Sequence, residues 1–173
     1  GITKIYDNGF VANKNVTFWL NEGEILALVG ENGAGKTTLM KVLFGLEAPQ
    51  SGQVTMNGAP VKILNTLDAI GKGIGMVHQH FMLVPSLTVA ENVVLGIEPM
   101  KNGLFDFDTA VSMTQEVADK YNFNIDPKMK VADLSVGQMQ KVEIMKVLIK
   151  GAKIIIMDEP TSAITDKEVK VLF

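Results

Sequence analysis

Cysteine and arginine are both absent from the 173-residue sequence, and each absence excludes a class of chemistry. Without cysteine the chain has no disulfide, no thiolate metal site and no cysteine nucleophile, which fits a reducing compartment. All 16 basic side chains are lysine, so the chain offers no arginine finger to a phosphoryl-transfer reaction.

Excess positive charge and long apolar runs are also missing. The formal net charge is -3, so no overall positive field attracts nucleic acid, and we expect no nucleic-acid partner. No apolar run approaches the roughly 20 residues that cross a bilayer as a helix. The chain starts at Gly1 rather than methionine and has no signal peptide, so we expect a piece of a longer protein. Its 47% hydrophobic and 20% charged residues are ordinary for one globular domain.

The first half of the chain has the pattern of short strands around one helix. Alternating apolar residues predict two strands of an antiparallel piece, at 2–5 and 16–20. The continuous apolar run 25–29 predicts a strand buried on both faces. Residues 37–44, closed by Gly45, predict a helix, and the Asn-Gly pair within 53–61 predicts a β-hairpin.

The second half changes towards helices before it returns to a strand. Residues 74–77 read as a short buried strand, and Thr88 with Glu91 forms the pattern of a capping box. Helical spacing of apolar residues predicts helices from Asp108 and along 139–149. The run 154–157 predicts a second fully buried strand. Together the patterns predict an α/β fold with a helical middle segment.

A glycine-rich segment between the strand at 25–29 and the following helix matches the phosphate-binding pattern G-x-x-x-x-G-K-[ST]. Glycines let backbone N–H groups surround phosphate oxygens, and the helix N-terminus adds its positive dipole end. Lys36 supplies a full charge to the phosphates, and the hydroxyl of Thr37 suits Mg²⁺. The predicted nucleotide ligands are Gly30, Glu31, Asn32, Gly33, Ala34, Gly35, Lys36, Thr37 and the adjacent Thr38.

Two acids follow the apolar strand 154–157. Ligands of open parallel sheets gather at the carboxyl ends of strands, so Asp158 is placed to hold Mg²⁺. Glu159 is then placed to orient or deprotonate the water that attacks the γ-phosphate. The alternative is a helix N-cap cluster shared with Thr161 and Ser162.

The segment Leu-Ser-Val-Gly-Gln at 134–138 precedes an apolar helical stripe. Taken alone, Ser135 is equally well explained as an ordinary N-cap. The order along the chain favours more: a phosphate loop, then Gln79 after a strand, then this segment, then a strand ending in Asp-Glu. In that order the chain resembles the ATP-binding cassette (ABC) ATPases over essentially its whole length, and the segment 134–138 is the family's signature.

The resemblance implies a phosphate-loop NTPase core with a RecA-like parallel sheet, an antiparallel β-subdomain and a helical signature subdomain. It implies a core of residues 1–79 and 152–173, a helical subdomain of 80–151, and truncation at the C-terminal end before a histidine that holds the γ-phosphate. It also implies that Tyr6 stacks on adenine and that Gln79 contacts Mg²⁺ and the attacking water. Ser135, Gly137 and Gln138 would contact ATP bound to an opposite cassette.

Finer features narrow the resemblance to importers of simple sugars and nucleosides, whose ATPase is a tandem duplication. Val136 stands in the signature where most members have glycine, and the stretch around His78 and His80 leans towards the nucleoside branch. The implied function is an ATP hydrolase that powers such an importer from the cytoplasmic face of the membrane. Its implied partners are transmembrane permease subunits, a second cassette and, indirectly, a substrate-binding protein. The alternative is a soluble ABC protein acting on ribosomes or DNA, and we expect the piece alone to hydrolyse ATP poorly.

Overall fold

The computed structural model describes residues 1–158, which belong to two compact units, Gly1–Lys72 and a second that starts at Gly73. The predicted division into 1–79 with 152–173 and 80–151 stays a prediction. The predicted catalytic Glu159 and the alternative cap residues Thr161 and Ser162 lie outside the described residues. Within residues 1–158, no helix is both long and apolar enough to span a bilayer.

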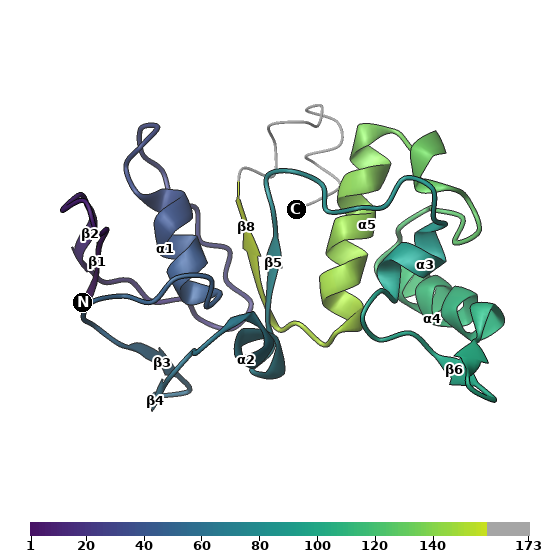
Figure 1. Ribbon diagram of the computed structural model, residues 1–173, viewed down its shortest axis with the longest axis horizontal. Helices are drawn as coiled ribbons and strands as arrows, with labels where there is room; N and C mark the ends of the chain where they lie inside the picture. The colour runs from purple at the N-terminus through teal and green to yellow at the C-terminus, as the bar shows by residue number, and fades with distance from the viewer. Residues whose placement is uncertain (159–173) are drawn as a thin grey trace. The chain divides into compact units, whose positions relative to one another are not determined.

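The first unit is built on a short antiparallel pair and one helix. Strands β1 (Ile2–Ile5) and β2 (Val11–Val16) pair with Ile5 opposite Val11. Helix α1 (Lys36–Leu43) packs against them because Leu39 and Val42 form a buried cluster with Ile2. Figure 1 shows α1 beside this pair.

A hairpin and a short helix complete the first unit. Strands β3 (Val54–Met56) and β4 (Ala59–Val61) are joined by Asn57 and Gly58, whose φ angles of 51° and 77° fit the predicted type I′ turn. Helix α2 (Thr66–Gly71) starts where the Asn65 side chain accepts the Asp68 N–H.

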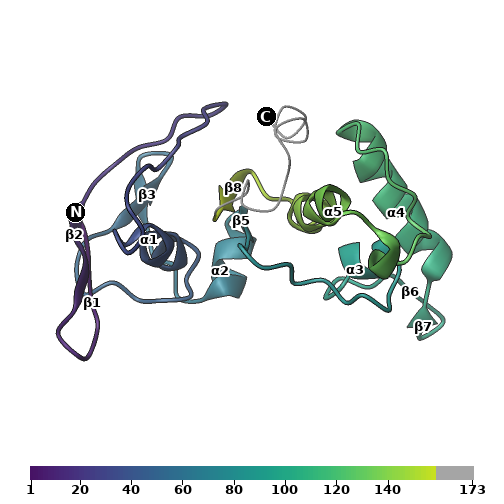
Figure 2. The same cartoon turned by 90° about the horizontal axis from the view of Figure 1, so that it is seen from above.

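The second unit pairs two parallel strands and surrounds a helical core. Strands β5 (Ile74–Val77) and β8 (Ile154–Met157) run side by side next to α5 (Val136–Ile149), as Figure 1 shows. The short α3 (Val89–Val93) contacts both α4 (Phe107–Lys120) and α5, and the three helices group together in Figure 2. Their core includes four side chains that are fully buried, Val89 and Val93 of α3 and Val142 and Met145 of α5.

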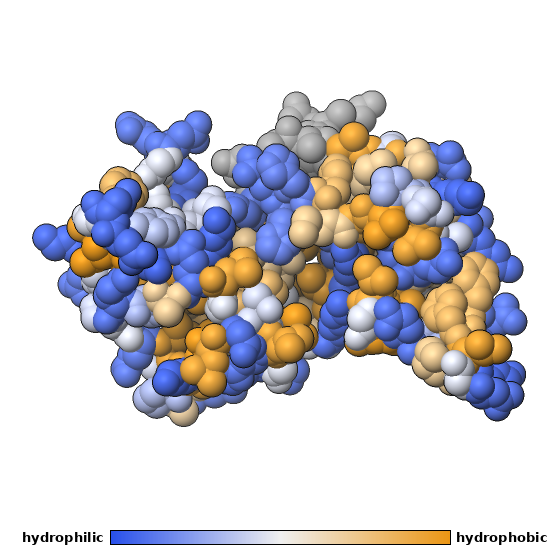
Figure 3. Space-filling view, in the orientation of Figure 1, coloured by the Kyte–Doolittle hydropathy of each residue, from blue (hydrophilic) through white to orange (hydrophobic). Residues whose placement is uncertain are grey.

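A second hairpin of the same unit carries exposed apolar side chains. Strands β6 (Met100–Lys101) and β7 (Leu104–Phe105) are joined by Asn102 and Gly103, with φ of 54° and 82°. Met100 and Leu104 are 62% and 74% exposed, and Figure 3 shows apolar colour over this hairpin.

Several expectations are corrected. The run 25–29 was expected as a buried strand, but it joins no β-ladder of the described residues, and Ile25 and Val29 are 71% and 95% exposed. The expected strand at 16–20 is wrong beyond Val16, where β2 ends. Strand β8 is half-buried except at Ile156 rather than fully buried. A strand exists only where a neighbour takes its backbone hydrogen bonds, and apolar composition cannot supply that neighbour.

Candidate functional site

The predicted phosphate loop, residues 30–37, has a backbone conformation that requires glycine at two positions. Gly33 and Gly35 have φ of +84° and +85°, the left-handed region that disfavours residues with a Cβ. Gly35 is also packed closely, because a Cβ there would lie 2.2 Å from the carbonyl oxygen of Ala12. The chain passes directly from Gly35 into α1, so the loop ends at the first turn of that helix.

The N-terminus of α1 has no side-chain cap. Its N-cap is Gly35, which offers no side-chain hydrogen bond to the first-turn N–H groups. Thr37 and Thr38 lie in that first turn. N–H groups without a side-chain cap and the positive dipole end of a helix suit an anion such as phosphate.

Lys36 folds back over the loop it follows. Its Nζ donates hydrogen bonds to the carbonyl oxygens of Gly30 at 2.7 Å and Glu31 at 2.9 Å. Both acceptors are neutral, and within residues 1–158 no carboxylate forms an ion pair with this ammonium. The loop therefore holds a lysine charge in place for an anionic partner.

Tyr6 lies at the end of β1, and its ring is half-buried. Its hydroxyl contacts the Thr38 Oγ1 at 3.2 Å, so the structure brings this aromatic next to the residue that follows the phosphate loop. Phe10 stacks on the ring with centroids 6.3 Å apart. The structure thus places the predicted base-stacking residue and the predicted phosphate ligands of this unit together.

In the second unit, Gln79 and Asp158 are brought to one edge of a parallel strand pair. Val77 of β5 pairs with Met157 of β8, and the Asp158 N–H donates to the Val77 carbonyl oxygen at 3.2 Å. Gln79 follows β5, so an amide and a carboxylate leave the carboxyl ends of neighbouring strands. Oxygen donors of this kind are those that Mg²⁺ takes. Glu159, the next residue, lies outside the described residues.

The signature residues begin helix α5. Ser135 is its N-cap: the Ser135 Oγ accepts the Gln138 N–H at 3.3 Å, and the Gln138 Oε1 accepts the Ser135 N–H at 2.9 Å. The capping explanation is therefore confirmed. Ser135 remains exposed and Gly137 is buried, so a second role of Ser135 towards nucleotide is sterically open and stays a prediction.

Sequence reasoning missed the support of the segment after Gln79. The buried Glu143 carboxylate accepts the Met82 N–H, and the Lys146 Nζ donates to the Met82 carbonyl oxygen at 2.7 Å. The buried Asn92 side chain accepts the Val84 N–H at 2.8 Å and donates to its carbonyl oxygen at 3.0 Å. The only sequence signal was a Glu and a Lys three residues apart inside the apolar stripe of α5.

One helix cap of this unit contains a carboxyl group with a lowered pKa. The pKa of Glu91 is lowered because its carboxylate accepts hydrogen bonds from the backbone N–H and the hydroxyl of Thr88. This is the reciprocal capping box expected at the start of α3.

The chain belongs to the ABC transporter family, whose model matches residues 13–162. It is 51% identical to the guanosine import ATP-binding protein NupO of Bacillus subtilis over 95% of this chain and 32% of that protein. It is 47% identical to the nucleoside import ATP-binding protein NupA of Lactococcus lactis, over 99% of this chain and 34% of that protein. The ribose import ATP-binding protein RbsA 1 of Rubrobacter xylanophilus is 44% identical over the whole chain and 34% of that protein.

Solved structures agree with this family. The cbiO1 protein of Clostridium perfringens, described as part of the ABC transporter complex cbiONQ, has a TM-score of 0.80 at 26% identity, over 99% of this chain and 69% of that one. The ATP-binding cassette MJ0796 in its dimeric post-hydrolysis state has a TM-score of 0.78 at 29% identity, over 99% and 77%. They support the expected α/β cassette fold. The chain spans about a third of the length of the curated relatives it matches.

Proposed function

We propose that the chain binds and hydrolyses ATP as part of an ABC importer of nucleosides or simple sugars. The observation that carries this proposal is Lys36, held by two carbonyl oxygens of a glycine loop that leads into a helix N-terminus without a side-chain cap. The relatives reported above are all import ATP-binding proteins, which gives the alternative of a soluble ABC protein no support.

The phosphate loop does the binding. The ammonium of Lys36 turns from its carbonyl acceptors to the β- and γ-phosphates, and N–H groups of the loop and of the first turn of α1 contact phosphate oxygens. Gly30, Glu31, Asn32, Gly33, Ala34 and Gly35 contribute backbone, and the Thr38 side chain lies beside them. Tyr6 receives the adenine ring against its face.

Residues at the start of α1 and after strands β5 and β8 perform the chemistry. Thr37, Gln79 and Asp158 supply the oxygens that would hold Mg²⁺, which when bound neutralises phosphate charge. Glu159 orients a water molecule for attack on the γ-phosphate and takes its proton, while Gln79 holds that water in line. Ser135, Gly137 and Gln138 contact the nucleotide of an opposite cassette, so that ATP joins two cassettes.

The partners follow from the import names of the relatives. Transmembrane permease subunits, a second cassette and an extracytoplasmic substrate-binding protein fit a chain that works peripherally at the cytoplasmic face of the membrane. Between the two substrate classes we favour nucleosides, because the relatives at 51% and 47% identity are named for guanosine and nucleoside import. Uptake of labelled guanosine and ribose by cells with and without the full-length gene distinguishes the two classes.

ATP binding is tested with Lys36→Ala in the full-length protein, with the exposed Lys62→Ala of the same unit as the matched control. Loss of a charged hydrogen-bond donor costs about 1.5–3 kcal/mol, so calorimetry should show ATP affinity reduced by roughly 10- to 150-fold. Thermal unfolding should change little in either variant. Equal ATP affinity of Lys36→Ala and the parent would remove the basis of the proposed function.

A further inference from the structure

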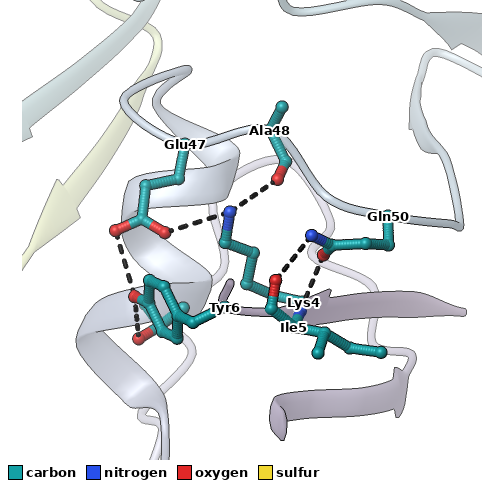
Figure 4. Close-up of polar contacts among 7 residues, drawn as sticks. Lys4, Ile5, Tyr6, Glu47, Ala48 and Gln50 are labelled. Atoms are coloured by element: carbon teal, nitrogen blue, oxygen red, sulfur yellow. Dashed lines mark hydrogen bonds and ion pairs between the residues drawn. The ribbon is translucent and has the colours of Figure 1, made fainter. Parts of the chain in front are cut away.

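The Tyr6 hydroxyl is held by a chain of polar groups that extends beyond the nucleotide-binding motifs, to Glu47 and Lys4. The Tyr6 hydroxyl donates to the Glu47 Oε1 at 3.1 Å and contacts the Thr38 Oγ1 at 3.2 Å. The Glu47 Oε2 forms an ion pair with the Lys4 Nζ at 3.4 Å. Figure 4 shows Tyr6, Glu47 and Lys4 pointing toward one another from β1 and the segment that follows α1.

The direction of these hydrogen bonds follows from the donor inventory. An ionised carboxylate only accepts, so the single hydroxyl proton of Tyr6 is directed to Glu47. Thr38 must then donate its own proton to the Tyr6 oxygen. Such a chain ends on a charged acceptor, which strengthens both bonds. Tyr6 is thereby tied to α1 and to Glu47 at the same atom.

The same segment also fixes the backbone beneath the ring. The Gln50 side chain accepts the Ile5 N–H at 2.7 Å and donates to the Ile5 carbonyl oxygen at 2.5 Å. Lys4 is fixed in turn, because its Nζ donates to the Ala48 carbonyl oxygen at 2.9 Å and lies 5.2 Å from the Tyr6 ring centroid. Residues 47–50 therefore hold the end of β1, just before Tyr6, through hydrogen bonds to the Ile5 backbone and contacts with the Lys4 side chain (Figure 4).

We propose that Glu47 is a positioning residue for recognition of the base, which holds the Tyr6 ring in the orientation in which adenine stacks on it. The inference rests on the proposed function, since it assumes that the site takes ATP. An aromatic ring that is held before binding loses little conformational freedom when a base stacks on it, and this raises affinity. Glu47 thus contributes to the binding of the base and not to that of the phosphates.

The experiment separates base from phosphate by using two probes, ATP and inorganic tripolyphosphate, titrated calorimetrically into the full-length protein. Tyr6→Phe keeps the ring and removes the anchoring hydroxyl, and Glu47→Ala removes the acceptor. Glu47→Gln keeps an acceptor oxygen for that hydroxyl and serves as the conservative rescue. Exposed Glu22→Ala, in the same unit, controls for loss of one negative charge.

Tyr6→Phe and Glu47→Ala should each lower ATP affinity about 3- to 10-fold and change tripolyphosphate affinity less than 2-fold, since a hydrogen bond contributes roughly 0.5–1.5 kcal/mol. Their double variant should lose about as much ATP affinity as the single variant with the larger loss, because both single changes remove the same Tyr6–Glu47 hydrogen bond. Glu47→Gln and Glu22→Ala should bind ATP like the parent.

Two results overturn the inference: unchanged ATP affinity in Tyr6→Phe, or equal losses of ATP and tripolyphosphate affinity in both variants. Retained tripolyphosphate binding shows that a variant has folded around its phosphate loop. Failure of the proposed function itself has a different signature, since the parent protein would then bind neither probe.

Discussion

Replacement of Glu143 by alanine tests whether the segment after Gln79 depends on helix α5. Glu143 is buried, its carboxylate accepts the Met82 N–H, and it forms an ion pair with the Lys146 Nζ at 3.4 Å. Lys146 in turn donates to the Met82 carbonyl oxygen at 2.7 Å. The backbone N–H and the carbonyl oxygen of Met82 are therefore both held by one pair of charged side chains, Glu143 and Lys146.

The magnitude follows from what the alanine leaves behind. A hydrogen bond to a charged group contributes about 1.5–3 kcal/mol, and the variant loses this contribution because the Met82 N–H no longer has its acceptor. The ion pair is nearly buried, with side chains 14% and 5% exposed, so Lys146 is also left without its partner. We expect a total loss of about 2–4 kcal/mol in the free energy of unfolding of this unit. Glu143→Gln keeps the acceptor and should lose about half as much.

The assay combines urea unfolding with hydrogen exchange of backbone amides in residues 80–84. Glu143→Ala should lower the unfolding midpoint and speed exchange at Met82 selectively, since that N–H is the one freed. Exposed Glu116→Ala on α4 removes the same charge without a buried contact and should change neither measurement. A loss below about 0.5 kcal/mol, or exchange at Met82 like that of the parent, would refute the reasoning.

Three further changes are expected to be measurable. Glu159→Gln should retain ATP binding in the full-length protein and nearly abolish steady-state hydrolysis, because an amide cannot take the proton; parental turnover would assign that role elsewhere. Gly35→Ala should lower the free energy of unfolding more than Gly33→Ala. At both positions the positive φ makes a side chain cost about 1–2 kcal/mol, but only at Gly35 would the new Cβ also clash with the Ala12 carbonyl oxygen. Glu91 has a lowered folded pKa, so its capping contribution is present above its unfolded pKa and is lost as pH falls through the folded value; Glu91→Gln should flatten the acid side of the stability profile.

Local patterns predicted the elements whose cause is local. The capping box at Thr88 and the N-cap at Ser135 formed as the sequence indicated, because each needs only four consecutive residues. The Asn-Gly turn between β3 and β4 was predicted for the same reason, while the equivalent turn at Asn102 was missed. Its flanking strands have two residues each, too few to show an alternation.

Elements that depend on a distant neighbour were predicted less well. The run 25–29 has the composition of a buried strand, yet Val29 is 95% exposed because no described strand pairs with it. The loop residues of the site were found from their spacing, and Asp158 was placed at a strand end by the rule for parallel sheets. Gln79 was identified only through the family resemblance. Their supports were not found, because Glu143 contacts a residue 61 positions away and Glu47 one 41 positions away.

The two missed acids have a common physical role that explains why motif spacing overlooks them. Each carboxylate accepts a hydrogen bond from a distant segment that carries a candidate site residue. Glu47 accepts the Tyr6 hydroxyl, and Glu143 accepts the backbone N–H three residues after Gln79. A motif needs its residue types at fixed spacing because they touch one ligand, whereas a support needs only an acceptor at the right place in space. Substitutions that leave every motif residue intact should therefore still weaken binding or hydrolysis when they fall at these acceptors. Their effects should be absent from equally charged but exposed positions such as Glu22 and Glu116.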